Sequence, residues 1–287
     1  MRTSLFCAFT TCLLIGCSPA TSPNDGGGGG TGGSGGGGSE EVFFNVSGVA
    51  KVHPVAAEFL ADAGIDAGLI GLTVRVEEPL KVALSNPDGV FSTQTLDSTG
   101  AFSATNIAST DINLGVAVGI FDPTDAGTRV VRSATIIFDV ALQDSKPTTN
   151  VSGTAFAVPV QFHDKLTAAI TEAKIRMITG ANNKPTLYEA GFILGRVVDA
   201  AGKPVAGAKI LPAPAALASG FFYPTADLNS LGTSTSSNGV FIYVHTGDAV
   251  NTFRFTVEGQ TAYKQRNAGA RKEACVVIDV FPGLVAP

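Results

Sequence analysis

The sequence contains no Trp, and only 15% of its 287 residues are charged, whereas 45% are hydrophobic. Such a hydrophobic share excludes a disordered chain, and the 34 Gly residues exclude a mainly helical one. Acidic residues outnumber basic residues by 24 to 19, which gives a net charge of −5. An acidic chain offers no support for nucleic-acid binding, so we expect no nucleic-acid partner.

Motifs for catalysis are also missing. None of the three His is followed after three positions by the Glu that a zinc peptidase needs, because Ala56, Leu166 and Asp248 stand there. No Gly-x-Ser-x-Gly elbow follows an expected strand, and the glycine run at 26–38 lacks the Lys-Ser/Thr of a phosphate loop. We therefore expect no catalytic residue, no metal, no cofactor and no enzymatic activity.

The chain begins with an apolar segment that is too short for a transmembrane helix. Arg2 precedes an apolar run at 5–15, which ends in Leu-Leu-Ile-Gly-Cys at 13–17. This segment resembles a bacterial lipoprotein signal peptide, whose lipobox is Leu-x-small-Cys. The resemblance implies cleavage before Cys17 and acylation of Cys17 with chains such as palmitate, and Ser18 implies sorting to the outer membrane. The alternative is an ordinary secretory signal with a chance Cys.

Cysteine is scarce in the remaining chain. Cys7 and Cys12 lie in the expected signal peptide, and Cys17 would carry lipid, so only Cys275 remains. The mature domains therefore cannot form an intrachain disulfide and must rely on their cores. We expect Cys275 to be a small, buried strand residue.

After a Gly-rich segment that predicts a flexible tether, the pattern changes at residue 42 to short apolar runs between turn residues, which predicts strands. The expected strands are 43–52, 73–77, 81–85, 100–103, 114–121, 134–142, 191–199, 208–211, 239–245, 253–258 and 274–281. Residues 195–210 predict a hairpin, with Asp199, Gly202 and Pro204 in its turn. Four segments recur in the same order, which indicates a tandem of one fold. They are 46–50 with 193–197, 69–74 with 205–210, 97–102 with 236–241, and 134–140 with 274–280.

The second half resembles the carboxypeptidase regulatory-like family, whose pattern is Gly-x-Val-x-Asp-x-x-Gly-x-Pro-Val-x-Gly-Ala-x-Val, followed by Thr-x-x-x-Gly-x-Phe. The matching residues are Gly195, Val197, Asp199, Gly202, Pro204, Val205, Gly207, Ala208, Gly239 and Phe241. The resemblance implies a transthyretin-like Greek-key sandwich, a carbohydrate-binding-like fold, and it does not extend to a peptidase domain. In the first half a longer loop at 53–68, with an expected helical turn at 56–61, replaces the short turn.

These patterns predict an all-β fold, with two transthyretin-like Greek-key β-sandwiches in tandem and one amphipathic helix between them. We expect a signal peptide at 1–16, a lipidated Cys and tether at 17–41, a first sandwich at 42–142, a connector at 143–187 and a carboxypeptidase regulatory-like sandwich at 188–287. The helix is expected at 163–178, where apolar residues recur at helical spacing and Glu172 precedes Arg176 by four positions. Its apolar face is expected to pack on a sandwich, and a membrane-surface helix is disfavoured because the polar face is not strongly basic.

Function is expected in the loops where the two halves differ. The candidate binding residues are Phe221, Phe222 and Tyr223 in the loop at 213–230, and Phe59 and Leu60 in the loop at 53–68. Such side chains can stack on sugars, anchor a protein partner or simply cover the core. We expect a non-catalytic, lipid-anchored cell-envelope protein with a structural, adhesive or protein-binding role. The alternatives are a carbohydrate-binding surface module and an enzyme with an unrecognised loop-built site.

Overall fold

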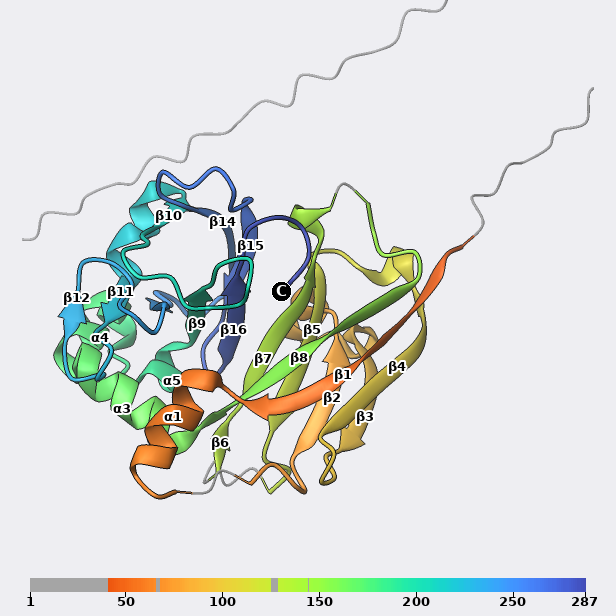
Figure 1. Ribbon diagram of the computed structural model, residues 1–287, viewed down its shortest axis with the longest axis horizontal. Coiled ribbons are helices and arrows are strands. Elements are labelled where there is room, and N and C mark those ends of the chain that lie inside the picture. The colour runs from red at the N-terminus through yellow and green to blue at the C-terminus, as the bar shows by residue number, and fades with distance from the viewer. Residues whose placement is uncertain (1–40, 66–67, 125–128, 144) are drawn as a thin grey trace, which may run out of the picture. The chain divides into compact units, whose positions relative to one another are not determined.

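The computed structural model describes residues 41–287, except 66–67, 125–128 and 144. The expected signal peptide, Cys17 and the tether up to residue 40 lie outside the described residues. The rest belongs to one compact unit, Glu40–Pro287 (Figure 1). The strands of the first half are β1 Phe43–Val52, β2 Thr73–Glu77, β3 Val90–Thr95, β4 Ala101–Ala108, β5 Gly115–Phe121, β6 Val130–Val131, β7 Ser133–Asp139 and β8 Asn150–Pro159. Those of the second half are β9 Phe192–Val197, β10 Ile210–Ala213, β11 Phe221–Pro224, β12 Leu231–Gly232, β13 Val240–Val244, β14 Asn251–Val257, β15 Arg266–Ala270 and β16 Cys275–Val280.

Within the described residues these strands form three sheets. The long sheet has the order β12-β11-β13-β9-β16-β7-β5-β2-β3 and crosses from one half to the other where β16 and β7 pair in parallel. The β1 sheet has the order β4-β1-β8-β6, and the β14 sheet has the order β10-β14-β15. The chain is therefore a β-sandwich protein whose two sandwiches share one sheet.

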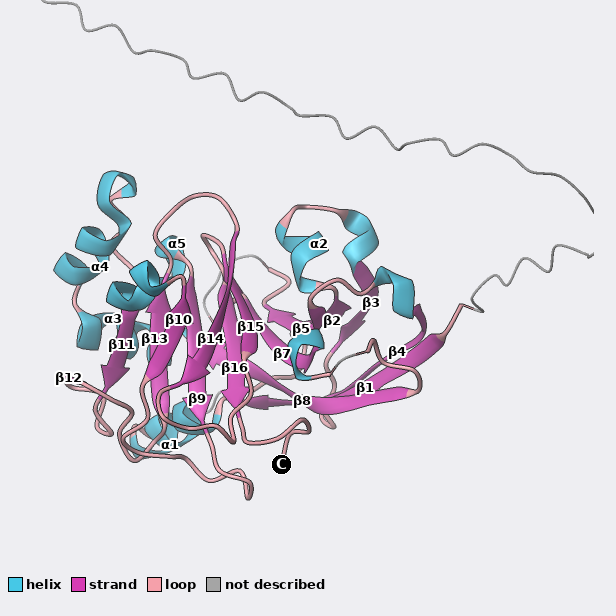
Figure 2. Cartoon of the chain, turned by 90° about the horizontal axis from the view of Figure 1, so that it is seen from above, coloured by secondary structure: helices cyan, strands magenta, loops and turns pink. Residues whose placement is uncertain are grey.

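Each sandwich has its own core. The β1 sheet packs on the first-half strands of the long sheet, and the β14 sheet packs on the second-half strands. Helices cover the remaining face of the second-half strands (Figure 2). This double cover explains why all residues of β9 and β13 are buried, whereas β1 alternates between buried and exposed positions.

The internal repeat is visible in the strand pairing. In each half the first strand lies between an antiparallel and a parallel neighbour, which are β4 and β8 for β1, and β13 and β16 for β9. Gly48 faces Phe102 across β1 and β4, and Gly195 faces Phe241 across β9 and β13. The fourth sequence match, of 134–140 with 274–280, was wrong, because β8 and not β7 occupies the position of β16. Apolar strands of similar length have similar sequence patterns, so only their pairing partners in the folded sheet show which strand is equivalent to β16.

The stretch at 195–210 contains the expected turn but not a full hairpin. Asp199 Oδ1 accepts hydrogen bonds from the backbone nitrogens of Ala201 and Lys203, and Gly202 has a φ of 75°. Beyond one bridge between Val198 and Pro204, however, the chain leaves the long sheet and continues as β10 in the β14 sheet. Where the chain leaves the long sheet, the backbone nitrogen of Gly207 donates a hydrogen bond to the carbonyl oxygen of Thr235, a residue distant in the sequence.

The helices differ most from the sequence expectations. They are α1 Pro54–Asp62, α2 Pro79–Ala83, α3 Val160–Ile170, α4 Glu172–Thr179 and α5 Leu187–Ala190. The expected helix at 163–178 is thus two helices, since Thr171 between α3 and α4 has a φ of 77°, which ends a helix. The strand expected at 81–85 was wrong, because α2 occupies 81–83 and a turn follows at 84–85. The helical turn expected at 56–61 is confirmed by α1, and the Glu172–Arg176 pair is confirmed at 2.6 Å.

The range expected as connector, 143–187, contributes a strand to the first sandwich. β8 pairs with β1 along eight residue positions and ends at Pro159. The β1 residues that pair with it lie about a hundred positions away in the sequence, so local pattern did not reveal this pairing.

A buried ion pair joins the two halves. Asp139, at the end of β7, accepts hydrogen bonds at Oδ2 from Arg266 Nε and Asn267 N, each at 3.0 Å. Its Oδ1 accepts from Asn267 Nδ2 and Ala141 N. The side chains of Asp139 and Arg266 are only 1% and 3% exposed. The carboxylate therefore binds β15 of the second half to β7 of the first.

We expect Asp139→Asn to lower the free energy of unfolding by about 3–5 kcal/mol, because it leaves the buried charge of Arg266 unpaired. Urea denaturation measures the change. Asp111→Asn is the matched control: Asp111 pairs with Lys81 at 2.9 Å but is 50% exposed, so a loss of at most about 1 kcal/mol is expected. Equal losses in the two variants would contradict the structural role of Asp139.

Gly195→Ala should also destabilise the second sandwich. A Cβ at Gly195 would lie 2.0 Å from Cζ of Phe241, whose ring is fully buried. We expect a loss of roughly 1–3 kcal/mol from this overpacking. Gly247→Ala, where no atom lies within 4 Å of the new Cβ, should leave the denaturation midpoint nearly unchanged, and a similar midpoint for both variants would refute the packing argument.

Candidate functional site

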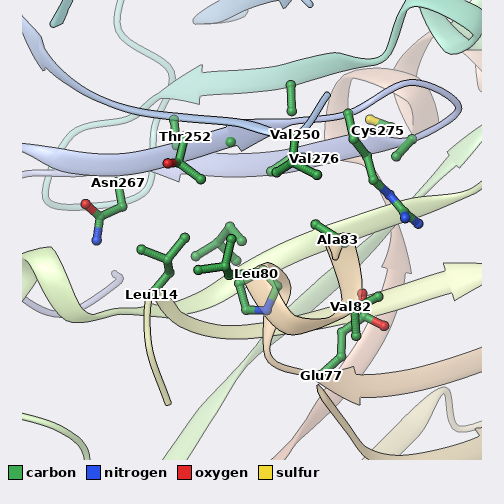
Figure 3. Close-up of a pocket in the computed structure, with 18 of the residues that line it drawn as sticks. Glu77, Leu80, Val82, Ala83, Leu114, Val250, Thr252, Asn267, Cys275 and Val276 are labelled. Carbon is green, nitrogen blue, oxygen red and sulfur yellow. The ribbon is translucent and has the colours of Figure 1, made fainter. Parts of the chain in front are cut away.

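A narrow cleft of about 90 Å³ lies where the two halves meet (Figure 3). α2 forms one wall with Leu80 and Ala83, and Val250, just before β14, belongs to the opposite wall. Ile136 of β7 and Val276 of β16 also line it, so the shared long sheet forms part of its surface. The cleft is apolar over most of its lining and open to solvent.

Glu78 explains why α2 lies at this cleft. Its Oε2 accepts a hydrogen bond from the backbone nitrogen of Lys81 at 2.7 Å, which caps the helix, and Pro79 occupies the first helical turn, where Pro is favoured. Its Oε1 accepts from the backbone nitrogen of Leu114 at 2.9 Å. One buried carboxylate therefore starts α2 and fastens it next to β5.

Three arginines that are distant in the sequence meet at this cleft. Arg132 and Arg271 line the cleft, and together with Arg75 they line an adjoining hollow of about 260 Å³. The guanidinium carbons of Arg75 and Arg132 lie 5.1 and 5.2 Å from the centroid of the Phe121 ring, which holds both side chains in place. Among the described residues, Arg132 and Arg271 have no ion pair.

Glu77 interacts electrostatically with all three arginines, and it is 5% exposed. Its Oε2 lies 3.0 Å from Arg75 Nη2. Burial raises the pKa of Glu77, and the charges of Arg75, Arg132 and Arg271 oppose that rise. Burial, followed by repulsion from Arg75, lowers the pKa of Arg132. Within the described residues no carboxylate lines the hollow of about 260 Å³, so its lining is positive in an otherwise acidic chain. Arg132 and Arg271 also line a larger hollow of about 1010 Å³, whose carboxylates are Asp122, Asp164, Glu189, Asp248 and Glu273.

The aromatic residues expected in a binding loop lie instead on β11, next to β13. Phe221 is 8% exposed and its ring centroid is 5.0 Å from that of Tyr243. Phe222 and Tyr223 are half-buried and pack against different core clusters. The Tyr223 hydroxyl accepts a hydrogen bond from the backbone nitrogen of Ile210. These side chains therefore contribute to packing, none of them lines the cleft, and their role in binding stays a prediction.

The residues expected in the other loop lie on α1. Leu60 is 2% exposed, and the Phe59 ring lies 6.1 Å from that of Phe162 on α3. Phe59 belongs to the packing between α1 and α3, and Leu60 is a buried residue of α1. Cys275 is 0% exposed, which confirms the expectation of a buried strand residue, and burial raises the pKa of its thiol.

The three histidines are separated and already engaged or enclosed. His163 Nε2 accepts a hydrogen bond from the backbone nitrogen of Tyr188 at 3.1 Å, and its Nδ1 is 2.9 Å from Asp164 Oδ1. His245 Nε2 is 2.8 Å from the carbonyl oxygen of Ala249. His53 is fully buried, with its ring centroid 5.8 Å from that of Phe162. In the part of the chain that the structure describes, no group of three or more His, Cys, Asp or Glu could hold a metal ion.

The site thus consists of an apolar slot beside a positive hollow, a combination suited to binding a group that is both apolar and anionic. Its three arginines come from β2, from the residue just before β7 and from the residue just after β15, and no local motif in the sequence connects them. The sequence signals that were present are the Glu78-Pro79 helix start and the alternation in β2, which places Arg75 and Glu77 on one face.

No family model matches the sequence, and no curated protein matches it. Among solved structures, the chain is similar to the Bacillus anthracis TIE protein, with 12% identity and a TM-score of 0.21 over 84% of this chain and 34% of that one. It is similar to the shaft pilin SpaA from Lactobacillus rhamnosus GG, with 11% identity and a TM-score of 0.20 over 86% of this chain and 100% of that one. It is also similar to the streptococcal ancillary pilin, with 9% identity and a TM-score of 0.22 over 84% of this chain and 62% of that one. The chain spans about a third of the TIE protein and under two thirds of the ancillary pilin. Likeness this low assigns no function.

None of the described helices has the length and apolar character needed to cross a membrane.

His53 should make stability depend on pH. Burial, and then the charge of Arg196, lowers its pKa from 6.5 to about 3. The unfolded chain therefore binds the proton more readily, so this contribution is complete above pH 6.5 and is lost as the pH falls toward 3. Between pH 7 and pH 5 we expect a loss of about 2 kcal/mol from this residue. His53→Leu should remove that part of the slope in urea denaturation series, and an unchanged slope would contradict the assignment.

Proposed function

We propose that this chain is a non-catalytic, lipid-anchored cell-envelope protein whose sandwiches have a structural, adhesive or protein-binding role. The observation that carries this proposal is the arginine-rimmed apolar cleft on a unit whose two halves share one sheet. Protein interfaces are enriched in Arg around a desolvated apolar centre, and this cleft has that composition.

The shape of the unit suits such a role. β16 and β7 pair at three residue positions, and the Asp139–Arg266 pair adds a buried contact close to the cleft. A surface that is held in this way loses little conformational entropy when a partner binds. In this function the shared sheet keeps the cleft in one conformation.

The proposed anchor is the lipid on Cys17, supported by the lipobox Leu-Ile-Gly-Cys at 14–17. Two or more acyl chains give stable membrane attachment, since each buried CH₂ contributes about 0.8 kcal/mol. The proposed location is the cell envelope, at the outer membrane. We also propose that 188–287 is a carboxypeptidase regulatory-like domain, which its motif residues and the pairing of β9 with β13 and β16 support.

Labelling cells with radioactive palmitate tests the anchor. The wild type should incorporate label, and Cys17→Ser should lose it. Cys275→Ser is the matched control and should keep the label, because Cys275 is buried in β16. Label retained in Cys17→Ser would overturn the lipid-anchor proposal.

Crosslinking in cells tests the binding role. A photoreactive amino acid at Ala83, on the cleft wall, should give one defined protein adduct, whereas the same group at Met177, which is 71% exposed on α4, should not. The same adducts from both positions, or none from Ala83, would argue against the cleft as the binding surface.

A further inference from the structure

We infer that the arginine-rimmed cleft binds an acidic segment of a partner protein, in which a carboxylate side chain lies next to a small aliphatic residue. This inference deepens the proposed function and rests on it, since it names the chemistry of the partner. The carboxylate would occupy the hollow lined by Arg75, Arg132 and Arg271, and the aliphatic side chain would enter the slot beside α2.

The charges of the hollow favour an anion. Three guanidinium groups line it, and no carboxylate belongs to its lining within the described residues. Glu77 lines the neighbouring slot and pairs with Arg75, which leaves Arg132 and Arg271 without an ion pair in the described part of the chain. Guanidinium groups bind carboxylates through two parallel hydrogen bonds, so two unpaired arginines form a suitable receptor.

Two of the three arginines are also held in position before any ligand arrives. Arg75 and Arg132 lie over the ring of Phe121, and Arg75 is fixed further by Glu77. Side chains that are already ordered lose less rotamer entropy on binding, so a single carboxylate can bind with measurable affinity.

The slot sets the second requirement. Val82, Arg132 and Arg271 line both the slot and the hollow, so an occupant of one adjoins the other. A volume of about 90 Å³ admits a small aliphatic side chain and is below the size of typical small-molecule pockets. The ligand therefore needs an aliphatic group within one residue of its carboxylate, as in a Val-Glu pair.

An acidic polysaccharide fits these observations less well. Sugars bind by stacking on open aromatic faces, and Phe121, the aromatic residue of the cluster, already has two guanidinium groups against its ring. The apolar slot would also lack a partner on a sugar acid.

Isothermal titration calorimetry of the purified full-length protein tests the inference with the capped peptide acetyl-Gly-Val-Glu-Val-Gly-amide. The Gln analogue of this peptide should bind about tenfold more weakly, because a hydrogen-bonded charge is lost. Arg132→Gln and Arg271→Gln should each cause a similar loss, while Arg271→Lys should recover part of it. The matched control Arg254→Gln, at an exposed position of β14, should bind as the wild type does.

A second variant tests the slot independently of the charges. Ala83→Phe should fill it and weaken the Glu peptide by about tenfold while all three arginines remain. Thermal unfolding of each variant shows that it is folded. Equal binding of the Glu and Gln peptides, wild-type affinity in the arginine variants, or tighter binding of inorganic phosphate or polygalacturonate than of the Glu peptide would overturn the inference.

The outcome separates this inference from the proposed function. If Arg132→Gln and Arg271→Gln abolish the crosslink at Ala83 in cells, both stand. If these variants keep the adduct and the lipid label, the binding role stands and the acidic-segment inference fails. If the wild type gives no adduct although it binds the Glu peptide, the proposed cellular role fails and the chemistry of the cleft stands.

Discussion

The structure depends on a single buried carboxylate. Asp139 ends β7 with its side chain out of water, so its oxygens require partners within the protein. The partners come from the other half, from Arg266 and Asn267, and from Ala141 just beyond the strand. Satisfying this carboxylate positions β15 opposite β7. Arg266 also donates to the carbonyl oxygen of Asp279, which extends the network to β16.

The cleft follows from that arrangement. The long sheet continues through β7 and β16, while the β14 sheet covers only its second-half strands. The edge of the β14 sheet at β15 therefore faces α2 across a gap, and this gap is the apolar slot. Because Arg271 follows β15 and Arg132 precedes β7, the same arrangement places both arginines at one end of the slot. The proposed binding surface is thus a consequence of how two sandwiches share a sheet.

Sequence reasoning succeeded where local chemistry dominates. β1 and β2 have the expected bounds, because alternating burial on a one-sided strand leaves a period of two in the sequence. It failed where partners were distant. β8 was assigned to a connector although it pairs with β1, and α3 and α4 were read as one helix because the positive φ at Thr171 has no signal in helical periodicity. The aromatic residues at 221–223 were expected on a loop, yet their β pairing with β13 places them in or against the core.

The sequence by itself determined the β-rich class, the repeat, the turn at Asp199 and the lipobox that motivates the proposed anchor, since each is encoded within a few neighbouring residues. Only the tertiary structure decided that the two sandwiches share one sheet and that Arg75, Arg132 and Arg271 meet. Strand pairing and charge clustering arise from contacts between residues far apart in the chain. Their free energy depends on burial and on the local dielectric, which exist only once the chain has folded.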